Sequence, residues 1–208
     1  MLQTERLPFA DPNAIPTAKR VIASGGLIAF PTDTIYGVAA DPFNPIAIQR
    51  IYEAKERPET KALPVLIGEV AQLAELSSPI TDKVEAITRA FWPGALTLIL
   101  TKVPGLPAEL SPYPTIGVRM PDLPATLALL RATGPLATTS ANISDGPNPV
   151  SAEDVLNQLG GRIELLLDGG PTPGPMASTV VDLTQPEMKI LREGPIALSD
   201  LQACLPKD

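Results

Sequence analysis

Apolar residues along the chain occur in two patterns, short continuous runs and runs with helical spacing. Short apolar runs bounded by glycine, proline or polar clusters are typical of buried strands. We expect strands at residues 27–30, 63–67, 95–100, 115–119, 136–138, 163–167, 178–183 and 189–191. Apolar residues spaced three or four apart predict helices at residues 14–24, 45–55, 69–76, 82–91, 123–131 and 152–159, with a short last helix. Strands and helices alternate early and strands cluster late, which predicts one α/β domain with a mixed sheet.

Polar residues at the starts of several predicted helices are typical helix caps. Asn13, Asn44 and Ser199 each precede an apolar helical pattern, and Asn44 is followed by proline at the first helical position. Ser151 with Asp154 resembles a capping box. These four helix starts are therefore part of the prediction.

The composition limits the classes of function that the chain can have. It has 208 residues, of which 44% are hydrophobic and 19% charged, so a folded core is expected. A net charge of -7 argues against a broad electrostatic surface for nucleic acid. There is no histidine and one cysteine, Cys204, which excludes Cys/His zinc sites, a Ser-His-Asp triad and internal disulfides.

The N-terminal residues 1–6 lack the apolar segment of a signal peptide. No apolar run approaches the length that a membrane-spanning helix needs. We expect a soluble, cytoplasmic protein that has no contact with a membrane.

A polar turn follows the first predicted strand. Thr32, Asp33, Thr34 and Tyr36 come directly after the apolar residues 27–30 and Pro31. Ligands in open α/β sheets collect beyond the carboxyl ends of strands, so a binding site is one interpretation of this turn. A capped loop without a function is an equally good interpretation of this segment alone.

A second polar turn, residues 138–146, follows the strand predicted at residues 136–138. It carries Thr138, Thr139, Ser140, Asn142 and Ser144. Hydroxyl, amide and backbone donors on a turn suit phosphate or carboxylate binding. The same residues also form turns with their own backbone, but the repeated arrangement favours binding.

Four basic residues lie near the ends of predicted helices or strands. Lys55 falls in the last turn of a helix, and Pro58 moves Arg57 out of the helix, so both side chains can reach one anion, with Lys61 nearby. Arg119 ends a strand, where it can form a bidentate pair with a carboxylate. The alternative for the first three residues is that they only stabilise the C-terminus of a helix, and the alternative for Arg119 is a structural ion pair.

Together these segments resemble the YrdC-type domain of threonylcarbamoyl-AMP synthases. The segments that carry the resemblance occur in the family's order: residues 30–37 (FPTDTIYG), 54–58 (AKERP), 118–121 (VRMP), 139–144 (TSANIS), 178–182 (STVVD) and 191–194 (LREG). The family's Lys-x-Arg and Ser-x-Asn signature falls on Lys55, Arg57, Ser140 and Asn142. The resemblance covers most of the chain and implies a single YrdC-type domain over residues 1–208, with a core at about 13–198.

The resemblance implies a fold and a reaction. The fold is an α/β domain with a twisted, mostly parallel sheet, flanking helices and a large concave cavity. The reaction joins L-threonine, bicarbonate and ATP into threonylcarbamoyl-AMP and pyrophosphate. The product then passes to the tRNA threonylcarbamoyl-transferase machinery that modifies adenosine 37. Because the threonine carbamate is itself an anionic nucleophile, the chemistry needs positioning and cationic stabilisation, and the lack of histidine is no obstacle.

Site residues follow from the same resemblance. The residues implied to bind threonine are Thr32, Tyr36, Lys61, Arg119, Thr138 and Ser178. The residues implied to bind ATP are Lys55, Arg57, Thr115, Ser140, Ser144, Asn142, Asn148 and Arg192. The four signature residues would be catalytic. Mg²⁺ would accompany ATP and be held mainly by its phosphates, since the sequence contains no dedicated carboxylate cage for a metal.

The chain departs from the family in two ways. Many relatives have a histidine in the strand after the Lys-x-Arg segment, and residues 63–67 contain none. Longer relatives have a second domain, so here the loops at residues 103–114 or 168–177 are candidates to close the site.

Two other functions remain open. One is a non-catalytic paralogue that binds nucleotide or RNA, although retention of the four signature residues favours the synthase, and any direct tRNA contact would be weak. The other is a carbamoyl-transferring module like that inside the much longer hydrogenase-maturation proteins.

Overall fold

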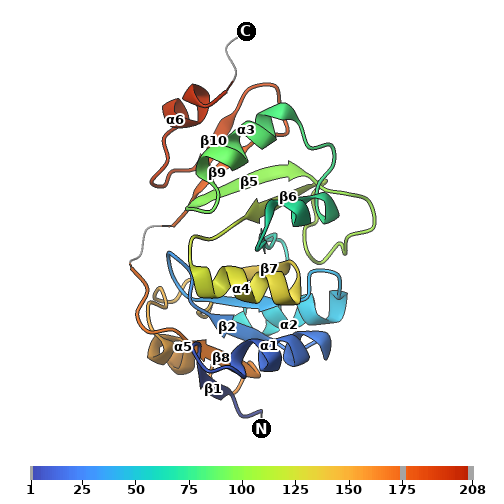
Figure 1. Ribbon diagram of the computed structural model, residues 1–208. Helices are drawn as coiled ribbons and strands as arrows, with labels where there is room; N and C mark the ends of the chain where they lie inside the picture. Colours follow the sequence, from blue (N-terminus) through green and yellow to red (C-terminus); the bar gives the residue numbers. More distant parts are fainter. Residues whose placement is uncertain (1, 174–176, 206–208) are drawn as a thin grey trace.

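The computed structural model describes residues 2–173 and 177–205, and its strands form one ten-stranded sheet. The strand order is β1-β8-β2-β3-β7-β4-β6-β5-β9-β10, so the sheet begins and ends with the first and last strands of the chain. Figure 1 shows the sheet twisting along the long axis of the molecule, with β1 at one end and β10 at the other. One continuous sheet confirms the predicted single α/β domain.

The elements have the following bounds. The strands are β1 Glu5–Pro8, β2 Ile28–Phe30, β3 Gly37–Ala40, β4 Val65–Leu66, β5 Leu96–Thr101, β6 Thr115–Arg119, β7 Leu136–Ser140, β8 Leu165–Asp168, β9 Thr179–Asp182 and β10 Lys189–Arg192. The helices are α1 Ala14–Ala23, α2 Pro45–Lys55, α3 Asp82–Phe91, α4 Pro124–Thr133, α5 Ala152–Leu159 and α6 Leu198–Ala203, with a 3-10 helix η1 at Val70–Glu75.

The expectation of a mostly parallel sheet is wrong. Antiparallel pairs outnumber parallel ones: β2–β3, β3–β7, β4–β7, β5–β6 and β9–β10 are antiparallel, whereas β1–β8, β2–β8, β4–β6 and β5–β9 are parallel. For β2 and β3 the cause is the short hairpin connection between them. A parallel pair needs a crossover of a dozen or more residues, and the turn between these strands is much too short for one.

Helices cover the sheet and its two faces carry two separate cores. Ile28 and Phe30 of β2 point into one core together with Ala18 of α1 and Leu129 of α4. Ala29 of β2 points into the other core, which α2, α3 and α5 cover. This alternation is expected of a strand that is buried on both faces. The two cores hold the strand ends that carry the polar turns in fixed positions.

Two strands were not predicted. β1 ends in proline and lies at the edge of the sheet, where proline is tolerated but gives no strand signal. β3 has the sequence GVAA, in which the glycine and the two alanines are unfavourable in strands and only Val38 favours one. It is a strand because it is completely buried between β2 and β7.

The helix caps agree only in part with the prediction. Asn44 accepts hydrogen bonds from Ile46 and Ala47, and Ser151 forms a capping box with Asp154, as predicted. Asn13 makes no capping hydrogen bond, because its backbone is itself helical. Ser199 lies inside α6, where the Asp200 carboxylate instead accepts from the backbone N–H of Ala197 at 3.1 Å.

Within residues 2–173 and 177–205, no helix is both long enough and apolar enough to cross a membrane.

Candidate active site

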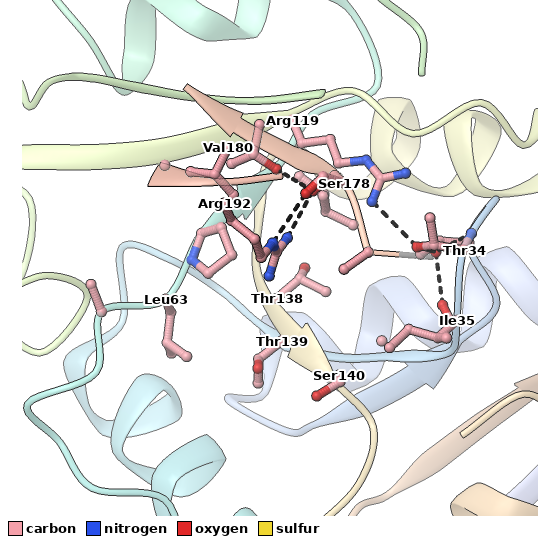
Figure 2. A pocket seen from close by; sticks show the side chains of 18 of the residues that line it. Thr34, Ile35, Leu63, Arg119, Thr138, Thr139, Ser140, Ser178, Val180 and Arg192 are labelled. Atoms are coloured by element: carbon pink, nitrogen blue, oxygen red, sulfur yellow. Dashed lines mark hydrogen bonds between the residues drawn. The ribbon is translucent and has the colours of Figure 1, made fainter. Parts of the chain in front are cut away.

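A cavity of about 480 Å³ lies against one face of the middle strands, since alternate residues of β5 (Thr97, Ile99) and of β6 (Gly117, Arg119) line it (Figure 2). It is lined by Thr32, Thr34, Ile35, Tyr36, Gly37, Arg57, Ala62, Leu63, Pro64, Leu66, Thr97, Ile99, Gly117, Arg119, Thr138, Thr139, Ser140, Asn148, Ala177, Ser178, Val180 and Arg192. The volume is in the range of sites for small molecules and cofactors. The lining mixes apolar side chains, hydroxyls and three guanidinium groups, and therefore suits an anionic ligand with an apolar part.

The two predicted polar turns meet at this cavity. Antiparallel pairing of β3 with β7 places Gly37 opposite Ser140, and the backbone N–H of Ala141 donates to the carbonyl of Tyr36 at 2.9 Å. A Cβ atom on Gly37 would lie 2.7 Å from Cγ2 of Thr138, so only glycine allows this approach. Strand pairing thus brings together two segments that are a hundred residues apart in sequence.

Two hydroxyls of the first turn, those of Thr32 and Tyr36, are already bonded to the backbone. Thr32 Oγ1 donates to the carbonyl of Ile35 at 2.7 Å. Tyr36 Oη donates to the carbonyl of Gly170 at 2.6 Å and accepts from the N–H of Gly169 at 3.2 Å. Burial raises the pKa of the Tyr36 phenol to about 12, so it stays protonated. Both side chains line the cavity, but these hydrogen bonds mainly fix the shape of its wall.

Arg119 is the most enclosed cation of the lining. Its Nε donates to the carbonyl of Gly94 at 3.0 Å, one Nη to Thr34 Oγ1 at 3.3 Å, and the other Nη to Asp33 Oδ1 at 2.6 Å. The side chains of Arg119 and Asp33 are only 9% and 14% exposed. Burial lowers the pKa of Arg119, and the Asp33 carboxylate opposes that shift. A guanidinium has five N–H groups, so two remain for a ligand such as a carboxylate.

A chain of hydrogen bonds links β5 and β10 through Ser178, the residue before β9, at the other side of the cavity (Figure 2). Arg192 of β10 donates to Ser178 Oγ at 3.0 Å, and Ser178 Oγ lies 2.8 Å from Thr97 Oγ1 of β5. Arginine only donates, so Ser178 Oγ must accept from it, and one of the two hydroxyls is left with a hydrogen. No acceptor for that hydrogen is present in the part of the chain that the structure describes. The pair can therefore donate one hydrogen bond to a ligand oxygen.

Arg57 and Lys55 differ in their surroundings. Arg57 lines the cavity and donates to the carbonyls of Lys61 and Ala62 at 3.3 and 3.2 Å. Lys55 is 1% exposed, and its Nζ donates to the carbonyls of Ser140 and Asn142 and to Asn142 Oδ1. Burial, helped by the positive charge of Arg57, lowers the pKa of Lys55 to about 7. The oxygen atoms around Nζ favour the protonated form, which has three hydrogens to donate.

The positive charge in the cavity is largely unneutralised. Arg119 has Asp33 as its partner, but within the described ranges no carboxylate lies within 4.0 Å of Arg57 or Arg192. Burial lowers the pKa of Arg192, and the nearby charge of Arg119 lowers it further. Two cations that line one cavity without carboxylate partners among the described residues favour a ligand with more than one negative charge.

The structure brings most of the predicted site residues to the cavity. Those that line it are Thr32, Tyr36, Arg57, Arg119, Thr138, Ser140, Asn148, Ser178 and Arg192. The predicted residues that are not part of its lining are Lys55, Lys61, Thr115, Asn142 and Ser144. Lys61 is exposed and lies 3.9 Å from Asp145, and Thr115 pairs with Thr101 in the sheet.

Sequence reasoning missed Thr97 of the lining and the role of Asp33. Thr97 interrupts the apolar strand LTLILT, and a hydroxyl in a buried strand is a signal of a partner or ligand. Asp33 was noticed only as part of the first turn. Its partner Arg119 is far away in sequence, so the ion pair has no local signature.

The described part of the chain offers no cage of its own for a metal ion. Among the described residues, no group of three or more His, Cys, Asp or Glu side chains could hold one. The described lining contains hydroxyls but no carboxylate. A hard cation such as Mg²⁺ would therefore reach this cavity only with a ligand that supplies its oxygens.

Comparison with protein families gives one match that covers most of the chain. The Sua5/YciO/YrdC family model, described as telomere recombination, matches residues 20–194. The range contains every residue of the cavity lining.

Curated relatives and solved structures agree with this match. A threonylcarbamoyl-AMP synthase of Bacillus subtilis is 41% identical over 97% of this chain and 59% of the relative. A putative threonylcarbamoyl-AMP synthase of Mycobacterium tuberculosis is 38% identical over 99% of this chain and 97% of the relative. The structure of Pyrococcus abyssi Sua5 complexed with L-threonine superposes with a TM-score of 0.90 at 36% identity, over 99% of this chain and 61% of that one. The chain spans about three fifths of the Bacillus and Pyrococcus proteins, and on all these grounds it belongs to the Sua5/YciO/YrdC family.

Proposed function

We propose that the protein is an L-threonylcarbamoyladenylate synthase, a nucleotidyltransferase that uses L-threonine, bicarbonate and ATP. The observation that carries the proposal is the cavity itself, where Arg119 pairs with Asp33 while Arg57 and Arg192 have no carboxylate partner among the described residues. The relatives' names and the threonine complex of the Pyrococcus protein support the same substrates. They favour this function over the non-catalytic paralogue.

The charges in the cavity suggest how the substrates are divided. Arg119 is neutralised by Asp33 and keeps two N–H donors, which suits the single carboxylate of an amino acid. Arg57 and Arg192 keep their full charge, which suits a triphosphate. The hydroxyl pair of Thr97 and Ser178 lies between Arg119 and Arg192 and would donate to an oxygen of either substrate.

The reaction needs no nucleophile from the protein. The threonine amine combines with carbon dioxide derived from bicarbonate, and a carbamate oxygen then attacks the α-phosphorus of ATP. The bond from the α-phosphorus to the bridging oxygen breaks, and pyrophosphate leaves with that electron pair. Holding both anions in one cavity supplies proximity, and the guanidinium groups stabilise the charge that develops on the phosphate oxygens.

Magnesium, downstream partners and location are further parts of this proposal. Mg²⁺ bound to the ATP phosphates would neutralise part of their charge, and no residue of the cavity lining is assigned to it. The labile product would pass to the tRNA threonylcarbamoyl-transferase machinery, with at most a weak contact between this protein and tRNA. Such a reaction would take place in the cytoplasm, where its substrates are available.

The test is pyrophosphate release by the purified protein with ATP and bicarbonate, with and without L-threonine. We expect release that depends on L-threonine and equals the amount of threonylcarbamoyl-AMP seen by mass spectrometry. Arg57→Ala should abolish it, whereas the control Arg162→Ala should not, because Arg162 lies outside the cavity and pairs with exposed Glu56. ATP binding without any release would support the non-catalytic alternative instead.

A further inference from the structure

Lys55 and Arg57 are two residues apart, and the family resemblance assigns both to the ATP phosphates. The structure separates them. Arg57 lines the cavity, but Lys55 is not among the described lining residues and is only 1% exposed. Their roles are therefore expected to differ.

The ammonium group of Lys55 already has a full set of partners. Nζ donates to the carbonyls of Ser140 and Asn142, and Asn142 Oδ1 lies 3.3 Å away. A protonated lysine has three N–H donors and no acceptor, so three oxygens use all of them. A phosphate could bind Nζ only by displacing one of these oxygens and leaving it unsatisfied inside the protein.

The partners of Lys55 belong to the turn at residues 140–146 that borders the cavity. The carbonyl of Lys55 also accepts from the N–H of Ser144 at 2.8 Å, so backbone and side chain hold the same turn. Asn142 Nδ2 closes the turn by donating to the carbonyl of Gly146 at 2.9 Å. Ser140, at the start of the turn, lines the cavity.

We propose that Lys55 is a positioning residue, which fixes the turn at residues 140–146 so that Ser140 faces the cavity, and that Lys55 does not itself bind the nucleotide phosphates. The identity of the ligand that the turn binds rests on the proposed function. The contacts between Lys55 and the turn do not rest on it, because they lie within the protein itself.

The first test compares amide hydrogen exchange in the free protein for wild type, Lys55→Met and Arg57→Met. Methionine is unbranched, apolar and adaptable in packing, so it removes the charge with little change of shape. The amides of Asn142, Ser144 and Gly146 are hydrogen-bonded within or beside the turn, and the amides of β6 serve as the reference. We expect the three turn amides to exchange at least about tenfold faster in Lys55→Met, equal to about 1.4 kcal/mol of local stability.

The matched variant Arg57→Met should leave turn exchange unchanged, because Arg57 bonds only to the backbone of residues 61 and 62 among the described residues. If Lys55→Met keeps the turn protected and only weakens ATP binding, Lys55 is a direct phosphate ligand and the proposal is wrong.

The second test uses wild-type protein and decides the question even if Lys55→Met fails to fold. Lysine side chains are acetylated at limiting reagent with and without ATP, and the rate at each site is followed by mass spectrometry. We expect Lys55 to react about tenfold or more slowly than half-exposed Lys61 in the free protein, with no further slowing by ATP. Rapid labelling of Lys55 that ATP prevents would overturn the proposal. Neither test depends on turnover, so failure of the proposed enzymatic function would be seen separately.

Discussion

The buried ion pair between Asp33 and Arg119 makes a specific contribution to stability that can be measured. Asp33 Oδ1 lies 2.6 Å from a guanidinium nitrogen, and the two side chains are 14% and 9% exposed. Asp33→Asn keeps the size and one acceptor but removes the negative charge. Arg119 then keeps its charge in an enclosed place without a compensating carboxylate.

The size of the effect follows from burial. Removing one partner of a buried pair completely costs about 3–5 kcal/mol, and a hydrogen bond to a charged group is worth about 1.5–3 kcal/mol. Because asparagine retains one hydrogen bond, we expect Asp33→Asn to lower the free energy of unfolding by about 2 kcal/mol. For a domain of 208 residues this corresponds to a fall in Tm of about 4–8 °C.

The measurement is urea unfolding followed by far-UV circular dichroism, with linear extrapolation to water. Asp145→Asn is the matched control, since Asp145 lies 3.9 Å from Lys61 and their side chains are 88% and 49% exposed. An exposed pair of this kind contributes about 0–1 kcal/mol. If Asp33→Asn changed stability no more than Asp145→Asn does, the buried pair would not be a net stabilising contact and the reasoning would be refuted.

Two further predictions concern the cavity wall, and a third concerns Asp168, which pairs with Arg6 and is not among the described lining residues. Gly117→Ala places a Cβ atom 3.3 Å from Cδ1 of Ile99 on the cavity wall; we expect KM for one substrate to rise about tenfold in the pyrophosphate assay, with unchanged urea unfolding. Thr97→Val removes one hydroxyl beside Ser178, so ligand affinity measured by calorimetry should fall by about 1 kcal/mol, and unchanged affinity for both substrates would exclude Thr97 from binding. Hydrogen bonding from the backbone N–H at residue 170, and then Arg6, lowers the pKa of Asp168 below its usual 3.8. Because the pKa of Asp168 is lower in the folded protein than in the unfolded chain, the ionised carboxylate stabilises the fold. This contribution is present above about pH 4 and is lost as the pH falls through the lowered pKa. The difference in free energy of unfolding between wild type and Asp168→Asn should therefore shrink below about pH 4.

Local signals in the sequence predicted those parts of the fold that local physics decides. β6 was predicted with its observed bounds, because Pro114 and Pro121 limit a short apolar run. α2 begins where Asn44 and Pro45 predict it, because cap and proline act within one turn. β3 was missed, because its small residues become a strand only through burial between two others.

In the candidate site, too, some features could be predicted from local sequence and others depend on the tertiary fold. Hydroxyls that follow an apolar strand, such as Thr32 and Ser140, could be found from sequence and line the cavity. The ion pair of Asp33 with Arg119 could not, because Asp33 lies in the turn after β2 and Arg119 ends β6, and the two meet only in the folded protein. The burial of Lys55 could not be found either, since a lysine at a helix end is usually exposed.

The strand order has a consequence for the nascent chain. The cavity wall begins with Thr32 and is completed by Arg192, whose strand β10 is the last of the sheet to be translated. During synthesis, the strands from β1 to β8 can pair while Arg192 has not yet left the ribosome. The nascent chain then exposes a folded half-cavity that lacks one of its two unneutralised cations, so it would bind a polyanion weakly until translation is nearly finished.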